Sequence, residues 1–159
     1  MATNARHPAA HRSGALLDHL ARTSRQASET VLADHGLKTR HYVALTLLRE
    51  QGASTQQGLA RLLQVDPTNL VGLLNDLEAA GFVARTRSTV DRRRHVVELT
   101  EQGADQLGAL EHALERVEDH VLGGLTAAQR EQLFKLLRLA TSGLALDCGA
   151  VAELDVAPE

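Results

Sequence analysis

The stretch from Arg85 to Thr100, RTRSTVDRRRHVVELT, combines a dense basic cluster with a β-prone end. Its first ten residues, Arg85 to Arg94, contain five arginines and one acid, although the 159-residue chain has a formal net charge of -3. The segments FVARTRS at the start of the cluster and HVVEL after it are both typical of short strands. Two strands joined by a basic tip are therefore predicted, and counterion release would draw such a tip to a phosphate backbone.

A helix-turn-helix is predicted just before this hairpin. Ser54 and Gln57 have the Ser-x-x-Gln spacing of a capping box, which predicts a short helix through three leucines, Leu59, Leu62 and Leu63. Asp66 is placed to cap a second helix and Pro67 to occupy its first position, where a missing N–H costs nothing. Gly81 would end that helix. Two short helices followed by a basic hairpin predict a winged helix.

The second helix of this motif is predicted to have one buried and one exposed face. At about 100° per residue, one face carries four leucines, Leu70, Leu73, Leu74 and Leu77. The opposite face carries Thr68, Gly72 and Asn75, with Val71 at its edge. Such small or amide side chains would let the helix enter a major groove, where Asn can pair bidentately with adenine. The alternative is an ordinary solvent-exposed face, and the arginines that follow favour DNA binding.

Helices are also predicted on both sides of the winged helix. One spans residues 14–35 and ends at a glycine, and another runs from about Arg40 to Glu50. Thr100 can cap a long helix whose apolar residues are spaced by three and four, namely Leu107, Leu110, Leu114, Val117 and Val121. Thr126 and Gln129 form a capping box before a last helix, whose inner face would carry Leu133, Leu136, Leu137 and Ala140. The seam of the long helix fits either a dimer interface or the core of one chain.

Composition limits the class of protein. A chain of 159 residues fits one domain, and 43% hydrophobic with only 2% aromatic residues favours a helical core of Leu, Val and Ala. No apolar run approaches the ~20 residues that span a bilayer, and the first residues lack the apolar segment of a signal peptide. A cytoplasmic protein is therefore expected. The single cysteine, Cys148, is expected to be incidental.

Two segments resemble the multiple antibiotic resistance regulator (MarR) family of winged-helix transcription factors. LNDLEAAGFVART, from Leu74 to Thr86, is similar to the family's Leu-Glu-x-x-Gly-hydrophobic-x-x-Arg signature. DRRRHVVELTEQG, from Asp91 to Gly103, is similar to its Asp-Arg-Arg…Leu-Thr-x-x-Gly signature. The resemblance implies a mainly α fold with a small two-stranded β wing. It also implies a homodimer whose winged helices reach consecutive major grooves of a pseudo-palindromic operator.

The resemblance and the charge pattern together predict three segments. They are a flexible N-terminal arm at 1–13, a single MarR-type domain at 14–142, and an acidic C-terminal tail at 143–159. Within the domain, the winged helix would span about 38–99, and the dimerisation helices about 14–35 and 101–142.

Roles are carried over by the resemblance where the motifs match. Arg92, Arg93 and Arg94 would contact the minor groove and its phosphates, and Asp91 would hold the wing in shape. The other expected DNA contacts are phosphate contacts by Arg85 and Arg87, groove contacts by Thr68, Val71, Gly72 and Asn75, and phosphate contacts by Gln56 and Gln57. Effectors of the family bind between the dimerisation helices and the winged helix, where the polar candidates are Arg22, Arg40, His41, Tyr42 and His112.

Other interpretations stay open at this level. The eight histidines would be solvated, form a pH-sensitive dimer interface or bind a metal, although no clustered Cys/His spacing is present. A winged helix can also serve as a protein-interaction module. No Ser/His/Asp order, phosphate-binding Gly-rich loop or pair of catalytic carboxylates indicates an enzyme. We therefore expect a homodimeric DNA-binding repressor released by a small-molecule effector, with no cofactor and no resident metal.

Overall fold

A computed structural model describes residues 13–88 and 95–142 of the chain. The predictions for the N-terminal arm (1–12), for Asp91, Arg92, Arg93 and Arg94, and for the acidic tail with Cys148 lie outside the described residues. Within them, the elements in chain order are α1 (Ser13–Asp34), α2 (Thr39–Gln51), β1 (Ser54–Thr55), α3 (Gln56–Leu62), α4 (Pro67–Ala79), β2 (Val83–Arg87), β3 (His95–Leu99), α5 (Glu101–Val121) and α6 (Ala127–Thr141).

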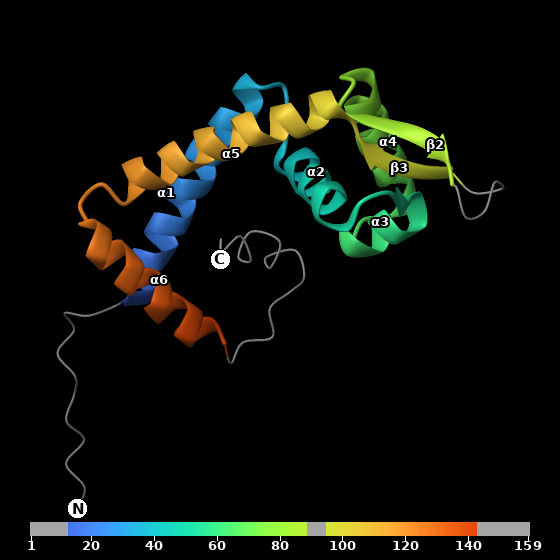
Figure 1. Ribbon diagram of the computed structural model, residues 1–159. Coiled ribbons are helices and arrows are strands. Elements are labelled where there is room, and N and C mark those ends of the chain that lie inside the picture. Colours follow the sequence, from blue (N-terminus) through green and yellow to red (C-terminus); the bar gives the residue numbers. More distant parts are fainter. Residues whose placement is uncertain (1–12, 89–94, 143–159) are drawn as a thin grey trace, which may run out of the picture.

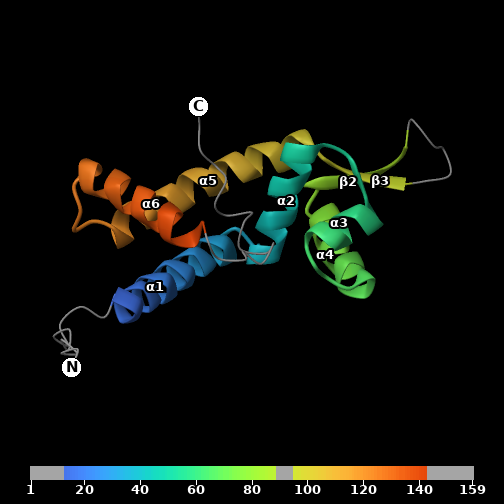
Figure 2. The same ribbon diagram turned by 90° about the horizontal axis from the view of Figure 1, so that it is seen from below.

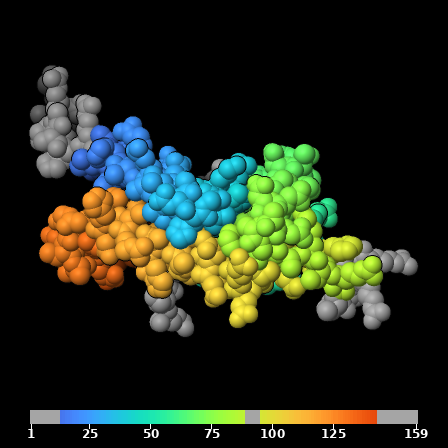
Figure 3. All heavy atoms as spheres, turned by 90° about the horizontal axis from the view of Figure 1, so that it is seen from above, coloured from blue at the N-terminus to red at the C-terminus, as the bar shows by residue number. Residues whose placement is uncertain are grey.

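The mainly helical fold with a small β wing is confirmed, and the molecule is elongated. In Figure 1, α5 runs from the sheet to the opposite end of the molecule, with α1 along it, and α6 starts at that far end and turns back. The view in Figure 2 separates α2, α3 and α4, which gather beside the sheet, from α1 and α6. Figure 3 shows the same division on the surface, where α1 lies along α5 and α4 lies at the sheet end.

The sheet has one strand more than the sequence indicated. Its order is β1-β3-β2, with both pairs antiparallel, and Ser54 and Thr55 of β1 pair with Val97 and Val96 of β3. The predicted cap at Ser54 is therefore wrong by one residue, because Ser54 takes part in the strand. Thr55 caps α3 instead, and its hydroxyl accepts a hydrogen bond from the N–H of Gly58 at 3.1 Å.

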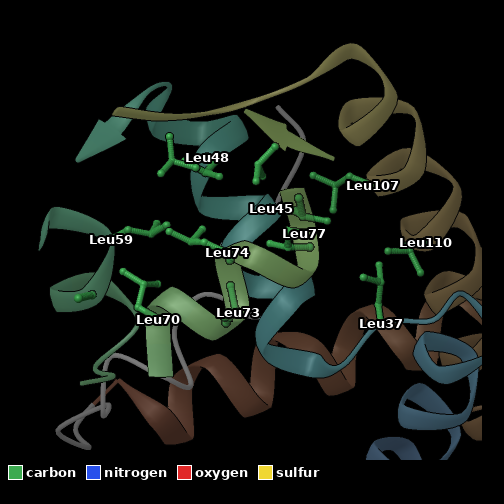
Figure 4. Close-up of a cluster of buried hydrophobic side chains, with 14 of the residues drawn as sticks. Leu37, Leu45, Leu48, Leu59, Leu70, Leu73, Leu74, Leu77, Leu107 and Leu110 are labelled. Carbon is green, nitrogen blue, oxygen red and sulfur yellow. The ribbon is translucent and has the colours of Figure 1, made fainter. Parts of the chain in front are cut away.

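One hydrophobic core holds the winged helix together. The four leucines predicted on one face of α4 are all buried, and they meet Leu45 and Leu48 of α2 and Leu59 of α3 (Figure 4). Leu107 and Leu110 of α5 are fully buried in the same core. The first half of the α5 seam is therefore core of a single chain, whereas Leu114, Val117 and Val121 are only half-buried.

Helix ends follow the predicted capping chemistry. Asp66 accepts hydrogen bonds from the N–H groups of Thr68 and Asn69, both at 3.0 Å, and so caps α4. α4 then ends at Gly81, whose φ of 77° lets the N–H of Phe82 reach the carbonyl of Leu77.

The turn between α3 and α4 uses the same left-handed ending without a glycine. Gln64 has a φ of 51°, and the N–H of Val65 donates to the carbonyl of Ala60. A residue with a Cβ is strained in this region of backbone conformation. The turn of the helix-turn-helix therefore stores a small amount of backbone strain.

A tight junction joins the sheet to α5. The Thr100 hydroxyl donates to the carbonyl of Gly81 at 2.7 Å and accepts the N–H of Gly103 at 2.9 Å. A Cβ on Gly103 would lie 2.0 Å from the carbonyl oxygen of Phe82. The Leu-Thr-x-x-Gly motif is explained by this junction: the threonine links two elements, and only glycine fits beneath it.

The last helix is not packed as predicted within one chain. α6 begins at the predicted capping box of Thr126 and Gln129, but it contains no buried residue. On its expected inner face, Leu136 and Leu137 are 56% and 38% exposed. The inner face stays a prediction that needs a second surface, because no element of the described chain covers this side of α6.

Candidate nucleic-acid interface

The exposed face of α4 is fixed by the burial of its leucines. Because those leucines point into the core, Thr68, Val71, Gly72 and Asn75 all face outward, with Val71 43% exposed. A Cβ added to Gly72 would meet no atom within 4 Å, so packing within the chain does not require a glycine there. Glycine inside a helix costs roughly 0.5–1 kcal/mol relative to alanine. A close approach by another molecule is a physical reason for tolerating that cost.

Arg85 is held against α4 rather than extended into solvent. One terminal nitrogen, Nη1, donates to the carboxylate of Glu78, and the other, Nη2, donates to Oδ1 of Asn75 at 2.8 Å. The side chain of Arg85 is only 23% exposed. This contact explains the spacing of Glu and Arg in the Leu-Glu-x-x-Gly-hydrophobic-x-x-Arg motif. The carboxylate of Glu78, at the end of α4, meets the guanidinium of Arg85 on β2.

The described part of the wing carries a second arginine. Arg87 is exposed at the end of β2, opposite His95 of β3. The two strands pair along their whole length, from Val83 and Leu99 near α4 to Arg87 and His95. β2 and β3 therefore form one antiparallel ribbon that leads away from α4. The three arginines predicted at the wing tip, Arg92, Arg93 and Arg94, fall in the undescribed connection between these strands.

The two glutamines lie at the start of α3. Gln56 is half-buried and Gln57 is exposed, directly after the cap formed by Thr55. They lie in the helix before α4, separated from it by the Gln64 turn.

The five residues proposed for an effector pocket are distributed over α1, α2 and α5. Arg22 pairs with Asp18 at 3.1 Å and His112 with Glu115 at 3.2 Å, all on exposed surface. Arg40 is exposed and Tyr42 packs at the edge of the core. A cleft of about 240 Å³ lies where α1 faces the start of α2, but its lining consists of other residues, Ala21, Ser24, Arg25, Ser28 and Thr39.

His41 belongs to the interior, which the sequence did not indicate. It is 5% exposed, its Nδ1 accepts the backbone N–H of Lys38 at 3.2 Å, and its Nε2 lies 3.6 Å from the Asp76 carboxylate on α4. Burial lowers the pKa of His41, with Lys38 acting in the same direction and Asp76 opposing it. A neutral His41 with its proton on Nε2 fits both contacts. It therefore links the first turn of α2 to α4.

A second link that sequence reasoning missed joins α2 to α5. Nη1 and Nη2 of Arg49 donate to the two carboxylate oxygens of Glu111 at 2.7 and 2.5 Å. These hydrogen bonds raise the pKa of Arg49, so the pair stays ionised. Because the partners are 62 residues apart in sequence, only the fold brings them together.

Two further features of the described ranges concern ligands and membranes. None of the helices in 13–88 and 95–142 is long and apolar enough to cross a membrane. In the same ranges, no three His, Cys, Asp or Glu side chains gather where they could hold a metal ion.

Comparison with known proteins identifies a matching family profile and several structures with the same fold. The MarR family profile matches residues 37–95, which run from the start of α2 to the start of β3. A Thauera aromatica protein named as a transcriptional regulatory protein for the hcr operon is 33% identical over 84 residues, which is 53% of this chain and 51% of the relative. The chain thus spans about half the length of that curated relative.

Solved structures extend the similarity beyond the matched segment. YusO from Bacillus subtilis superposes with a TM-score of 0.72 at 20% identity, covering 82% of this chain and 94% of YusO. Wild-type MarR from Escherichia coli gives 0.67 at 23% identity, covering 80% and 95%. CouR from Rhodococcus jostii, solved bound to p-coumaroyl-CoA, gives 0.62 at 26% identity, covering 86% and 96%. The fold is that of a winged-helix protein, and residues 37–95 match the profile of the MarR family.

Proposed function

We propose that this protein is a sequence-specific DNA-binding transcriptional regulator that acts as a homodimer. The observation that carries this proposal is the outward face of α4. Its small side chains stand opposite a fully buried leucine face, and the ribbon of β2 and β3 extends beside it. In this arrangement α4 would enter a major groove. Arg87, with Arg92, Arg93 and Arg94 of the tip, would contact phosphates and the minor groove.

The dimer is supported by the surface that one chain leaves uncovered. Leu16 on α1 is 68% exposed and Leu139 on α6 is 72% exposed, and α6 as a whole buries nothing within the chain. Apolar surface of this kind marks a site of protein association. α5, with 21 residues, spans about 30 Å at 1.5 Å per residue. That length is close to the roughly 34 Å that separates successive major-groove half-sites.

Release by a small-molecule effector completes the proposal, in which the regulator is a repressor. CouR, at 26% identity, is known with p-coumaroyl-CoA bound, which supports ligand binding by this architecture. In this chain the effector site would lie between α1, α2 and α5 and would use Arg22, Arg40, His41, Tyr42 and His112. An effector that binds better to a dimer with wrongly spaced recognition helices would shift the population away from the DNA-binding form.

The decisive experiment measures binding of the purified full chain to DNA from immediately upstream of its own gene and to an unrelated fragment, over a salt series. Selective binding with a steep salt slope is expected. Replacing Arg92, Arg93 and Arg94 with Ala should lower the affinity, and it should lower the salt slope by about one for each phosphate that an arginine no longer reaches. A control replaces Arg25 and Arg116, which are exposed on α1 and α5, and should leave both quantities unchanged.

The competing function is a winged helix that binds another protein. It predicts equal and weak binding to both fragments, and no selective effect of the wing-tip arginines. That result would overturn the proposal of a DNA-binding regulator, provided that sequences selected from a random duplex pool also show no enrichment.

A further inference from the structure

The contact between Arg85 and Asn75 determines which atoms the recognition helix offers to DNA. Asn75 lies on the outward face of α4 with Thr68 and Gly72, one turn or two away. Its amide has two different ends: Oδ1 accepts hydrogen bonds, and Nδ2 donates two. The orientation of this amide therefore decides whether Asn75 reads an acceptor, a donor or both on a base edge.

The orientation is set chemically by the arginine. A guanidinium carries five N–H donors and no acceptor, so the atom of Asn75 that lies 2.8 Å from Nη2 of Arg85 must be the oxygen. The arginine is itself fixed from the other side, because its Nη1 donates to Glu78, one turn after Asn75 on the same helix. A hydrogen bond from a charged donor is stronger than one between neutral groups. Oδ1 is thus turned towards β2.

From this geometry we infer that Asn75 presents its Nδ2 donor to DNA and selects a base edge that bears an acceptor. The inference rests on the proposed function of DNA binding and gives it a specific reading residue. Asparagine pairs bidentately with adenine only when Oδ1 and Nδ2 lie side by side on the N6/N7 edge. Oδ1 has two lone pairs, so the hydrogen bond from Arg85 leaves one free, but it fixes which end of the amide can face a base. Guanine, with acceptors at N7 and O6, adenine, with N7, and thymine, with O4, all match the Nδ2 donor, whereas cytosine offers a competing N4 donor.

Arg85 is accordingly a positioning residue for specificity. It would act through Asn75, without touching a base, and Glu78 would act through Arg85. Both belong to the Leu-Glu-x-x-Gly-hydrophobic-x-x-Arg motif, whereas Asn75 stands three residues before its Glu. The motif supplies a fixed donor, and the residue at position 75 converts that donor into a base preference.

The test selects sequences from a duplex pool with a randomised centre, using the full chain and its variants. Comparing wild type with Asn75→Ala identifies the base pair that depends on Asn75. At that base pair, wild type should prefer guanine or thymine over cytosine by about fivefold, the size of one hydrogen bond. Arg85→Leu should free the amide to turn Oδ1 towards the base and so raise cytosine, whose N4 donates, by a similar factor. In an Asn75→Ala background, Arg85→Leu should not alter the preference at this position.

A second variant tests the inference without removing Arg85, in case Arg85→Leu fails to fold. Asn75→Asp keeps an acceptor for Arg85 but turns oxygens towards the base, so the preference should move to cytosine, whose N4 donates. Arg87→Leu is the matched control on the same strand. It should weaken binding to all sequences alike, without changing base preference.

The outcomes separate this inference from the proposed function. Selective enrichment with cytosine preferred at the Asn75-dependent position in wild type would overturn the inference and leave the regulator intact. An unchanged base preference in Arg85→Leu would also overturn the inference and leave the regulator intact. Thermal unfolding checks that this variant is folded. Absence of any enrichment by wild type would overturn the proposed function, and the inference with it.

Discussion

The winged helix and the outer helices bury their leucines in different ways. Leu45, Leu74 and Leu107 are completely buried by other parts of the same chain, and they come from three separate helices. On α6, by contrast, Leu136 and Leu139 are 56% and 72% exposed. The difference teaches that the stability of the winged helix is determined within one chain. The outer helices need a second surface, and their stability should depend on protein concentration.

The largest expected effect is in the core of the winged helix. Leu74→Ala removes a fully buried side chain and leaves a cavity, so the free energy of unfolding should fall by about 3 kcal/mol. Chemical denaturation at two protein concentrations measures this loss, which should be the same at both. A loss that disappears at high concentration would mean that the core is completed by a partner.

A substitution in α6 should behave in the opposite way. Leu136→Ser should weaken self-association by about 2 kcal/mol, the value of burying one leucine, with little change in the stability of the dissociated chain. Sedimentation equilibrium measures the dissociation constant. Leu62→Ser is the matched control, because Leu62 on α3 is also exposed, at 39%, but lies in the winged helix. Equal effects of both variants would remove the distinction between the two regions.

A pH dependence of stability is expected inside the winged helix, at His41, which links α2 to α4. Its folded-state pKa lies below the ordinary value of 6.5 because it is buried. The unfolded chain therefore takes up the proton first as the pH falls. The contribution of His41 is fully present above about pH 6.5 and is lost as the pH falls through the folded-state pKa.

Unfolding measured at intervals from pH 7.5 to pH 5 tests this expectation. His41→Asn keeps an acceptor for the N–H of Lys38 but does not titrate, so its stability should fall less with decreasing pH than that of wild type. His112→Asn, at an exposed histidine beside Glu115, should follow the wild-type curve. An unchanged slope in His41→Asn would show that Asp76 compensates fully for the burial.

The smallest expected effect is a gain in stability at the turn between α3 and α4. Gln64→Gly removes the strain of a positive φ but adds chain entropy to the unfolded state, so a net gain of about 0.5 kcal/mol is expected. Thermal unfolding measures it. A decrease would mean that the glutamine side chain makes a stabilising contact that offsets the strain.

The sequence predicted those elements whose signals are local. Asp66 with Pro67, Thr100, and Thr126 with Gln129 each identified a helix start, because caps act within three residues. β1 was missed because two residues, Ser54 and Thr55, carry no periodicity, and their strand exists only through pairing with β3.

The contacts around the site depended on distant residues, and the sequence indicated them only in part. The outward face of α4 could be predicted from its leucine spacing. The position of Arg85 between Asn75 and Glu78 could not, because a residue on a strand must be placed beside a helix before the contact exists. The sequence predicted His41 as a polar residue of the effector pocket, whereas its burial follows from α4 packing across the first turn of α2.

The junction at Thr100 has a mechanical consequence. One residue separates β3 from α5, and Gly103 lies so close to the Phe82 carbonyl that the first turn of α5 has no room to pivot. We therefore expect α5 and the base of the wing to move together. Under the proposed function, a tilt along the roughly 30 Å of that helix would reach β2, β3 and the end of α4 and would change the angle at which the wing meets DNA.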